Sequence, residues 1–303
     1  MLDRDLSCPY NADASSEPAL TVVTGATLDL NGHTVTCAGT REVGIRIEDN
    51  SAAVRNGTVR DCYTGVRITG SDNLVRRLTL IANSYGLAIE RGTGNRIKAS
   101  AARDGQIGFL VAGGNTLTGN TATGNDTGFH LNGGDNDPQA LSVLIENEAT
   151  GNGYGVYVGT VRVRLIQNRI LRNGQDGVYV NASSGTLEGN RIANNQRNGI
   201  FCAYCNSLTV TDNKVIDNGG DGVLVDIRSN VDGPSPTLTN NRVLRNNHTG
   251  INVVGGAFTV FPATITGNRA RGNQVDLADD APNCAGGVWQ GNSFQTASQT
   301  CIH

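Results

Sequence analysis

The stretch Asn213-Lys214-Val215-Ile216-Asp217-Asn218, followed by Gly222-Val223-Leu224-Val225, decides the fold of this chain. Its template is an asparagine, four residues, a second asparagine, a short turn and then glycine-apolar-x-apolar. The same template recurs at 168–180, 190–202 and 241–253. A period of roughly 20 to 23 residues is typical of a solenoid. It separates most of the glycines that open the third segment: Gly44, Gly65, Gly86, Gly108, Gly128, Gly155, Gly177, Gly199, Gly222 and Gly250.

Each repeat contains short alternating pieces such as Leu208-Thr209-Val210. A period of two with many β-branched residues predicts strands rather than helices. Stacked turns place equivalent residues about 4.8 Å apart, so inward asparagines can form a hydrogen-bonded ladder and satisfy buried turn backbone. We expect the opening glycines to provide a positive φ at the turn.

These repeats, with the entry phrase Leu28-Asp29-Leu30-Asn31-Gly32-His33-Thr34-Val35, resemble the right-handed parallel β-helix family of pectate lyases, alginate lyases and mannuronan C5-epimerases. The resemblance covers roughly residues 26–275. It implies an all-β chain, a single-stranded right-handed parallel β-helix of roughly 11 to 12 rungs. We expect a single domain over 1–303, with an N-terminal cap at 1–25, rungs at 26–275 and a disulfide-clipped C-terminal cap at 276–303.

Charge and cysteine content limit the classes of partner and compartment. The net charge of −3 does not suggest a nucleic-acid partner, and no apolar run is long enough for a membrane span. The seven cysteines favour an oxidising compartment, so we expect a secreted or periplasmic protein whose export signal has been removed. We predict a Cys284–Cys301 disulfide and favour a local Cys202–Cys205 disulfide over a redox or metal site. Two of the three N-terminal cysteines could also pair: Cys8, Cys37 and Cys62.

The middle residue of each glycine-apolar-x-apolar segment points outward, because its neighbours fill the interior. In four successive repeats this position holds His130, Tyr157, Tyr179 and Phe201. Aromatic faces suit stacking against sugar rings, and His and Tyr can exchange protons. We therefore interpret His130, Tyr157, Tyr179 and Asp226 as catalytic candidates and Phe201 as substrate-binding. The alternative is that these aromatics only stabilise a sheet surface.

Polar residues flank the aromatic positions. Asn132 and Asn181 follow two of the same strands, and Asp135 and Asp137 lie on an insertion at 132–139. We interpret these four residues as substrate-binding. Further insertions at 228–236 and 255–262 follow the same strand, and insertions on one side of a solenoid often wall a binding face. Asp135 and Asp137 could also bind Ca²⁺, although a polar turn is favoured, so no metal site is assigned.

A cation follows the first ladder asparagine in five successive repeats, at Arg169, Arg191, Lys214, Arg242 and Arg269. Stacked like charges repel by roughly 1 kcal/mol per pair even in water. Neighbouring acids (Glu188, Asp212 and Asp217) or a bound polyanion can compensate, so we interpret Arg169 and Arg191 as substrate-binding. The alternative is a tolerated solvent-facing choice.

The resemblance implies proton abstraction at C5 of a uronate, by a lyase or C5-epimerase acting on an anionic polysaccharide or another polyanion. The Tyr-Gly-x-Asp-Pro-His-type signature of the epimerases, the calcium-binding aspartates of pectate lyases and the polygalacturonase signatures are missing. The alternatives are a non-catalytic binding, surface or periplasmic accessory β-helix, a glycoside hydrolase, and an enzyme of specialised metabolism. The substrate, the metal dependence and the oligomeric state stay open.

Overall fold

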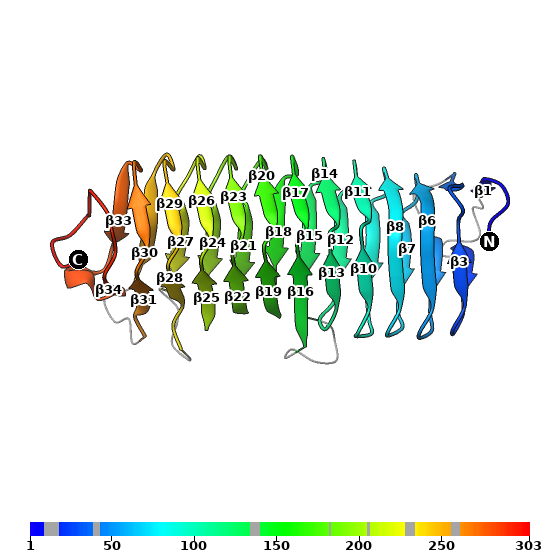
Figure 1. Cartoon of the computed structure of the whole chain (residues 1–303), viewed down its shortest axis with the longest axis horizontal. Coiled ribbons are helices and arrows are strands. Elements are labelled where there is room, and N and C mark those ends of the chain that lie inside the picture. The colour runs from blue at the N-terminus through cyan, green and yellow to red at the C-terminus, as the bar shows by residue number, and fades with distance from the viewer. Residues whose placement is uncertain are drawn as a thin grey trace. The chain divides into compact units, whose positions relative to one another are not determined.

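The computed structural model describes residues 1–8, 18–38, 43–133, 140–181, 183–204, 207–227, 234–255 and 261–303. Short parallel strands make up almost all of its regular structure, with a single 3-10 turn, η1 (Pro282–Cys284), in this part of the chain. The strands stack as a β-solenoid of about 11 turns, which confirms the predicted all-β class. The chain divides into two compact units, Met1–Asn152 and Gly153–His303, and Figure 1 shows the stacked arrows of each.

The first unit contains two parallel sheets. One is built from β1 (Leu6–Cys8), β3 (Thr27–Asp29), β4 (Thr34–Cys37), β6 (Ala53–Arg60), β8 (Leu74–Ile81), β10 (Arg96–Lys98), β11 (Ala101–Arg103), β13 (Thr116–Thr118), β14 (Thr121–Thr123), β16 (Leu141–Ile145) and β17 (Glu148–Thr150). The other follows the order β2 (Pro18–Val22), β5 (Val43–Ile47), β7 (Thr64–Ile68), β9 (Tyr85–Ile89), β12 (Ile107–Val111) and β15 (Thr127–Leu131).

The second unit contains three parallel ladders, each with one strand per turn. Ladder 1 runs through β18 (Tyr154–Val158), β21 (Val178–Asn181), β24 (Ile200–Ala203), β27 (Val223–Asp226), β30 (Thr249–Val254) and β33 (Val275–Asp279). Ladder 2 runs through β19 (Arg162–Ile166), β22 (Ser184–Glu188), β25 (Leu208–Thr211), β28 (Thr237–Thr239), β31 (Ala263–Thr266) and β34 (Gly287–Gln290). Ladder 3 runs through β20 (Arg169–Leu171), β23 (Arg191–Ala193), β26 (Lys214–Ile216), β29 (Arg242–Leu244) and β32 (Arg269–Arg271).

The interior follows the predicted alternation. In β27, Val223 and Val225 are buried while Leu224 between them is half-buried. In the first unit, the inward rings of Phe109 and Phe129 stack with centroids 5.0 Å apart. Inward apolar columns therefore form the core, and the intervening position of each strand is left on the surface.

The asparagine ladders are present as predicted. Asn190 Nδ2 donates to Asn213 Oδ1 at 2.9 Å, and Asn213 Nδ2 donates to Asn241 Oδ1 at 3.0 Å. The backbone N–H of each donor residue reaches the same acceptor oxygen. Asn213 Nδ2 also donates to the Leu187 carbonyl at 2.8 Å. Each buried amide thus satisfies the turn backbone of its neighbours.

The opening glycines serve a different purpose from the one we expected. None of them has a positive φ. A Cβ on Gly222 would instead lie 2.3 Å from Val243 Cγ1 and 2.6 Å from the carbonyl oxygen of Gly250. The positive φ falls on the residue before a ladder asparagine, as at Asp212 (55°) and Asp217 (57°). Glycine is required at these positions because the next turn approaches closely, and not because φ is positive.

The ends of the stack extend beyond the predicted repeat limits. β2 already pairs with β5 before residue 26, and β33 and β34 carry strands past residue 275. Trp289 on β34 is buried, as expected of a residue packed at this end, and its Nε1 lies 3.2 Å from Asp279 Oδ2. No helix in the described ranges is long and apolar enough to cross a membrane.

Two of the expected disulfides are confirmed. Cys284 bonds to Cys301, and among the N-terminal cysteines Cys37 bonds to Cys62. Cys202 is also disulfide-bonded, but Cys205 lies outside the described residues, so that pairing stays a prediction.

Candidate functional site

The outward positions form registered columns within each unit. In the first unit Leu110 pairs with His130. In the second unit Tyr157 pairs with Tyr179, and Tyr179 pairs with Phe201. The side chains of Tyr157, Tyr179 and Phe201 are half-buried, so their rings are part of the surface of ladder 1.

The rings of ladder 1 are packed against one another. Tyr157 and Tyr179 stack with centroids 5.0 Å apart and planes at 20°, and Phe201 meets Tyr179 edge-on at 5.3 Å. Tyr154, the first residue of the strand that also holds Tyr157, meets Tyr179 edge-on with ring centroids 6.1 Å apart. Four rings that brace each other in this way form a rigid apolar platform, which we call the aromatic platform: Tyr154, Tyr157, Tyr179 and Phe201.

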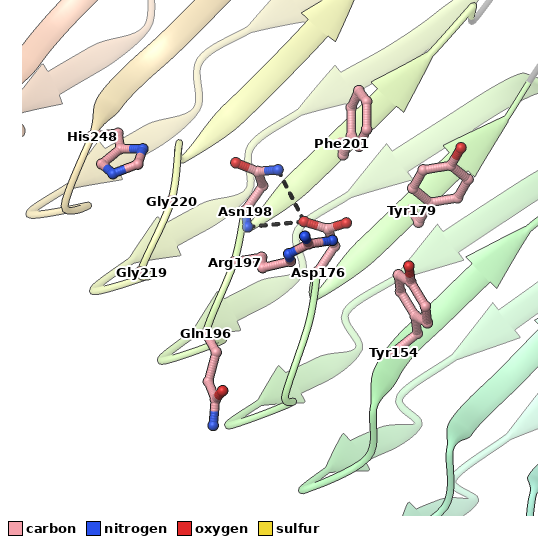
Figure 2. A pocket seen from close by; sticks show the side chains of 10 residues that line it. All are labelled: Tyr154, Asp176, Tyr179, Gln196, Arg197, Asn198, Phe201, Gly219, Gly220 and His248. Atoms are coloured by element: carbon pink, nitrogen blue, oxygen red, sulfur yellow. Dashed lines mark hydrogen bonds between the residues drawn. The ribbon is translucent and has the colours of Figure 1, made fainter.

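A cleft of about 360 Å³ adjoins this platform. Figure 2 shows three of the platform rings on one side of it and, on the other, polar side chains from turns that lead into strands of ladder 1. Its lining is Tyr154, Asp176, Tyr179, Gln196, Arg197, Asn198, Phe201, Gly219, Gly220 and His248. The cleft therefore combines apolar rings with a carboxyl group, a guanidinium and an imidazole.

Asp176 is the most unusual group in the cleft. Its side chain is buried, and Oδ1 accepts hydrogen bonds from the backbone N–H and Nδ2 of Asn198, both at 2.9 Å. In Figure 2 the other carboxyl oxygen points away from Asn198. Burial raises the pKa of Asp176 above its ordinary value, and the Asn198 bonds and nearby Arg197 only partly oppose this shift. A buried carboxyl with a raised pKa is suited to carrying a proton.

Asp221 occupies the same turn position two repeats later but is fully engaged. Its backbone N–H donates to Asn198 Oδ1 at 2.9 Å. Its Oδ1 accepts from the Thr249 N–H at 2.8 Å, and its Oδ2 accepts from Asn252 Nδ2 at 3.0 Å. Asp221 therefore ties adjacent turns together, whereas Asp176 keeps one oxygen for other partners.

Three further groups complete the cleft. Burial, reinforced by Tyr157, raises the pKa of Tyr179, so its phenol stays protonated at neutral pH. Arg197 is exposed at the cleft. The backbone of His248 has a structural role, because its N–H donates to the Gly220 carbonyl and its carbonyl accepts from the Gln274 N–H. Its exposed imidazole nevertheless lines the cleft (Figure 2).

His130 and Asn132 form a pair of their own in the first unit. His130 Nε2 lies 2.9 Å from Asn132 Oδ1, and burial lowers the pKa of His130. Tyr157 belongs to the second unit, and the structure describes each unit by itself. A shared site for His130 and Tyr157 therefore stays a prediction.

The remaining candidates lie apart from the cleft lining. Asn181 ends β21, and Asp226 is 5% exposed even though it follows the outward position of β27. Arg169 and Arg191 lie on ladder 3, whereas the aromatic platform lies on ladder 1. Asp135 and Asp137 fall outside the described residues. The Ca²⁺ hypothesis rests on Asp135 and Asp137, so it stays a prediction. Within the described part, no group of three or more His, Cys, Asp or Glu is placed to hold a metal ion.

A sequence signal for the missed residues existed at the position immediately before each opening glycine. It holds Tyr154, Asp176, Asn198 and Asp221 in four successive repeats of the second unit. Three polar residues in a row at a position that borders the core indicate a hydrogen-bonded column. This column lies outside the outward positions that follow each glycine, on which the predicted site was based.

Comparison with solved structures finds the same architecture in mannuronan and alginate epimerases and in a bacteriophage tailspike. The mannuronan C-5 epimerase AlgE6 A-module of Azotobacter vinelandii matches with a TM-score of 0.58 and 18% identity, over 88% of this chain and 84% of that one. The periplasmic alginate epimerase AlgG matches with a TM-score of 0.60 and 14% identity, over 91% and 78%. Tailspike protein 2 of bacteriophage CBA120 matches with a TM-score of 0.53 and 11% identity, over 91% and 42%. At these identities the likeness shows the fold alone.

Family and sequence comparisons give a broader result. No curated protein sequence matches this chain. The family model described as a right-handed β-helix region matches residues 20–144 and 139–298. These two matches span nearly the whole chain, and their repeats are the ones that build the ladders. The chain therefore belongs to the right-handed β-helix family.

Proposed function

We propose that this protein acts on an anionic polysaccharide, and that the cleft beside the aromatic platform transfers a proton at C5 of a uronate residue. The observation that carries the proposal is the position of Asp176, a buried carboxyl with a raised pKa, beside Arg197 and a braced set of aromatic rings. The solved structures of similar fold include alginate epimerases, which agrees with this class of substrate.

The aromatic platform provides the binding surface. Tyr179 and Phe201 lie on successive turns of ladder 1, so their rings are offset along the direction in which a polymer would run. The flat C–H faces of sugar rings pack well against such rings, and the neighbouring phenol of Tyr157 offers a hydrogen bond. A polymer along ladder 1 would place successive sugars on successive turns.

The polar side of the cleft provides the chemistry. Removal of the C5 proton develops negative charge on the adjoining carboxylate, and the Arg197 guanidinium can pair with that carboxylate. Asp176, when ionised, can accept the C5 proton, and the Tyr179 phenol or the His248 imidazole can donate one. Return of a proton to the opposite face of C5 gives epimerisation. Breakage of the C4–O bond, with the proton going to the leaving oxygen, gives elimination.

The direct test is proton NMR of alginate and polygalacturonate incubated with the protein in D2O, with and without Ca²⁺. An olefinic signal establishes elimination, and deuterium at C5 with an inverted sugar establishes epimerisation. We expect one of these signals with the native protein and its loss in Asp176→Asn. Asp212→Asn is the matched control, because Asp212 is an exposed carboxylate that does not line the cleft.

Two results would reject the proposal. Full activity in Asp176→Asn would remove the assigned role of this carboxyl. Shift perturbation of the polymer without any product, in all conditions, would favour the non-catalytic binding alternative for this β-helix.

A further inference from the structure

We infer that ladder 3 is a second docking surface, for an anionic polysaccharide chain that lies along the stack and away from ladder 1. The cations that carry this inference are Arg191, Lys214, Arg242 and Arg269, which we call the cation column. The strand registers pair Arg191 with Lys214, Lys214 with Arg242, and Arg242 with Arg269. Arg169 occupies the same register at the start of the column.

The cation column is on the surface and has no carboxylate partner in the described ranges. Lys214, Arg242 and Arg269 are exposed and Arg191 is half-buried. None of the ion pairs in the described ranges includes a residue of the cation column. Side chains on adjacent strands stand about 4.8 Å apart, so four like charges accumulate along one line.

The acids that border the column are engaged by other groups. Both carboxylate oxygens of Asp217 accept from Arg245, at 2.8 and 2.9 Å. Glu188 lies 3.8 Å from Arg164, and Asp212 accepts from the hydroxyl of Thr211 at 3.1 Å. The three acids that we considered from the sequence therefore contact other groups, and none of them forms an ion pair with the cation column.

The fold does not require cations at this position. The same register in the first unit holds mostly uncharged residues: Thr58, Thr79, Ala101, Thr121 and Glu148. Threonine or alanine thus supports the same ladder without the repulsion. The charge of the cation column is a local property of the second unit, and binding is the role that it fits.

The chemistry of the column selects a carboxylate-bearing chain. Guanidinium groups form planar, two-pronged contacts with carboxylates, and a repeating line of cations matches a partner whose charges also repeat. Single-stranded nucleic acids are bound by basic grooves with interleaved aromatic rings. The strands of ladder 3 contain no aromatic residue, so a polysaccharide fits this surface better.

The test compares two variants that lose the same residue types. The column variant carries Arg191→Thr, Lys214→Thr, Arg242→Thr and Arg269→Thr, which copies the first-unit register. The control carries Arg91→Thr, Arg96→Thr, Lys98→Thr and Arg103→Thr, all exposed cations of the first unit. Binding of polygalacturonate is measured by calorimetry at low salt, where exposed charges are least screened. Neutral dextran and single-stranded oligothymidylate serve as comparison polymers.

We expect the column variant to bind polygalacturonate about tenfold more weakly, with a shallower salt dependence, and the control to change by less than about twofold. Equal weakening in both variants would mean that net charge alone acts, and would overturn the inference. Unchanged binding in the column variant, or equally tight column-dependent binding of oligothymidylate, would also overturn it.

This inference needs no reaction in the cleft. Column-dependent binding with no NMR product would leave it standing while the proposed function fails. Product formation without column-dependent binding would support the proposed function and reject this inference.

Discussion

At the residue scale, the difference between Asp176 and Asp221 shows how one turn position can have two roles. Both are buried aspartates that precede an opening glycine. Asp221 uses both carboxylate oxygens to bond later turns, whereas the bonds of Asp176 converge on Oδ1. The first arrangement stabilises the stack, and the second places a carboxyl oxygen at the cleft. Asp176 and Asp221 are the same residue type, so the different roles come from the groups that surround each carboxylate.

Asp176→Asn should separate stability from activity. An amide keeps an oxygen that can accept from Asn198, and it avoids the burial of a charge. Since the folded pKa of Asp176 is raised, the folded state loses stability as pH rises from the unfolded value through the folded one. The variant should therefore be at least as stable as the native protein at pH 7, while turnover falls by about 10²–10⁴-fold. Urea unfolding and the NMR assay measure the two effects, and a large loss of stability would show that the ionised carboxylate stabilises the fold.

His130 should make the protein sensitive to acid. Burial lowers its folded pKa below the ordinary value of 6.5, so the unfolded chain takes up a proton first as pH falls. Its contribution to the free energy of unfolding is therefore complete above about pH 6.5 and decreases as pH drops toward the folded pKa. Urea unfolding at pH 7.5 and 5.5 should show a smaller decrease for His130→Gln than for the native protein. His303→Gln, at the exposed C-terminus, should follow the native protein, and an equal decrease in both variants would contradict this account.

At the element scale, the fold restricts residue type more strongly in the turns than in the strands. The asparagine ladders were predictable because a buried amide repeated at a fixed turn has few other uses. The role of the opening glycine was not predictable, because it depends on how closely the next turn approaches. The Cβ of an alanine at Gly199 would lie 2.3 Å from Val215 Cγ1 and 2.6 Å from the carbonyl oxygen of Gly222. Such distances exist only once the turns are stacked.

Removal of one ladder amide should be costly. Asn213→Ala removes the oxygen that accepts from the Asn190 N–H and Nδ2, and it removes the Nδ2 that donates to the carbonyls of Leu187 and Thr211. Each buried group left unsatisfied costs about 1–3 kcal/mol, so we expect a loss of several kcal/mol in urea unfolding. Asn247→Ala, at an exposed asparagine, should change stability by less than about 0.5 kcal/mol. Similar small effects in both variants would refute a stabilising ladder.

At the scale of the whole molecule, the fold follows from periodicity and the site does not. A repeat of 22 or so residues predicts stacked strands wherever it occurs, which is why the solenoid and its outward columns were predictable. The cleft depends on Arg197, Asn198 and His248, which lie in turns between repeats. The directions of these side chains depend on the local backbone path of each turn. The alternation along a strand does not predict that path, so the cleft was not predictable from the repeat.

The C-terminal disulfide should stabilise the end of the second unit. Cys284 and Cys301 are 17 residues apart, and closing a loop of about this size contributes about 3 kcal/mol in the chain-entropy model. The double variant Cys284→Ser, Cys301→Ser should lower the free energy of unfolding by about that amount. An unchanged midpoint in the variant would show that Trp289 and its neighbours hold this end without the disulfide.

The most direct measurement of the central claim is a crystal structure of Asp176→Asn with a uronate oligosaccharide bound. We expect a sugar ring packed on Tyr179 and Phe201, its carboxylate paired with Arg197, and its C5 within reach of residue 176. An oligosaccharide bound only along ladder 3, or one that leaves Tyr179 and Phe201 uncovered, would contradict the assignment of the cleft as the site of reaction.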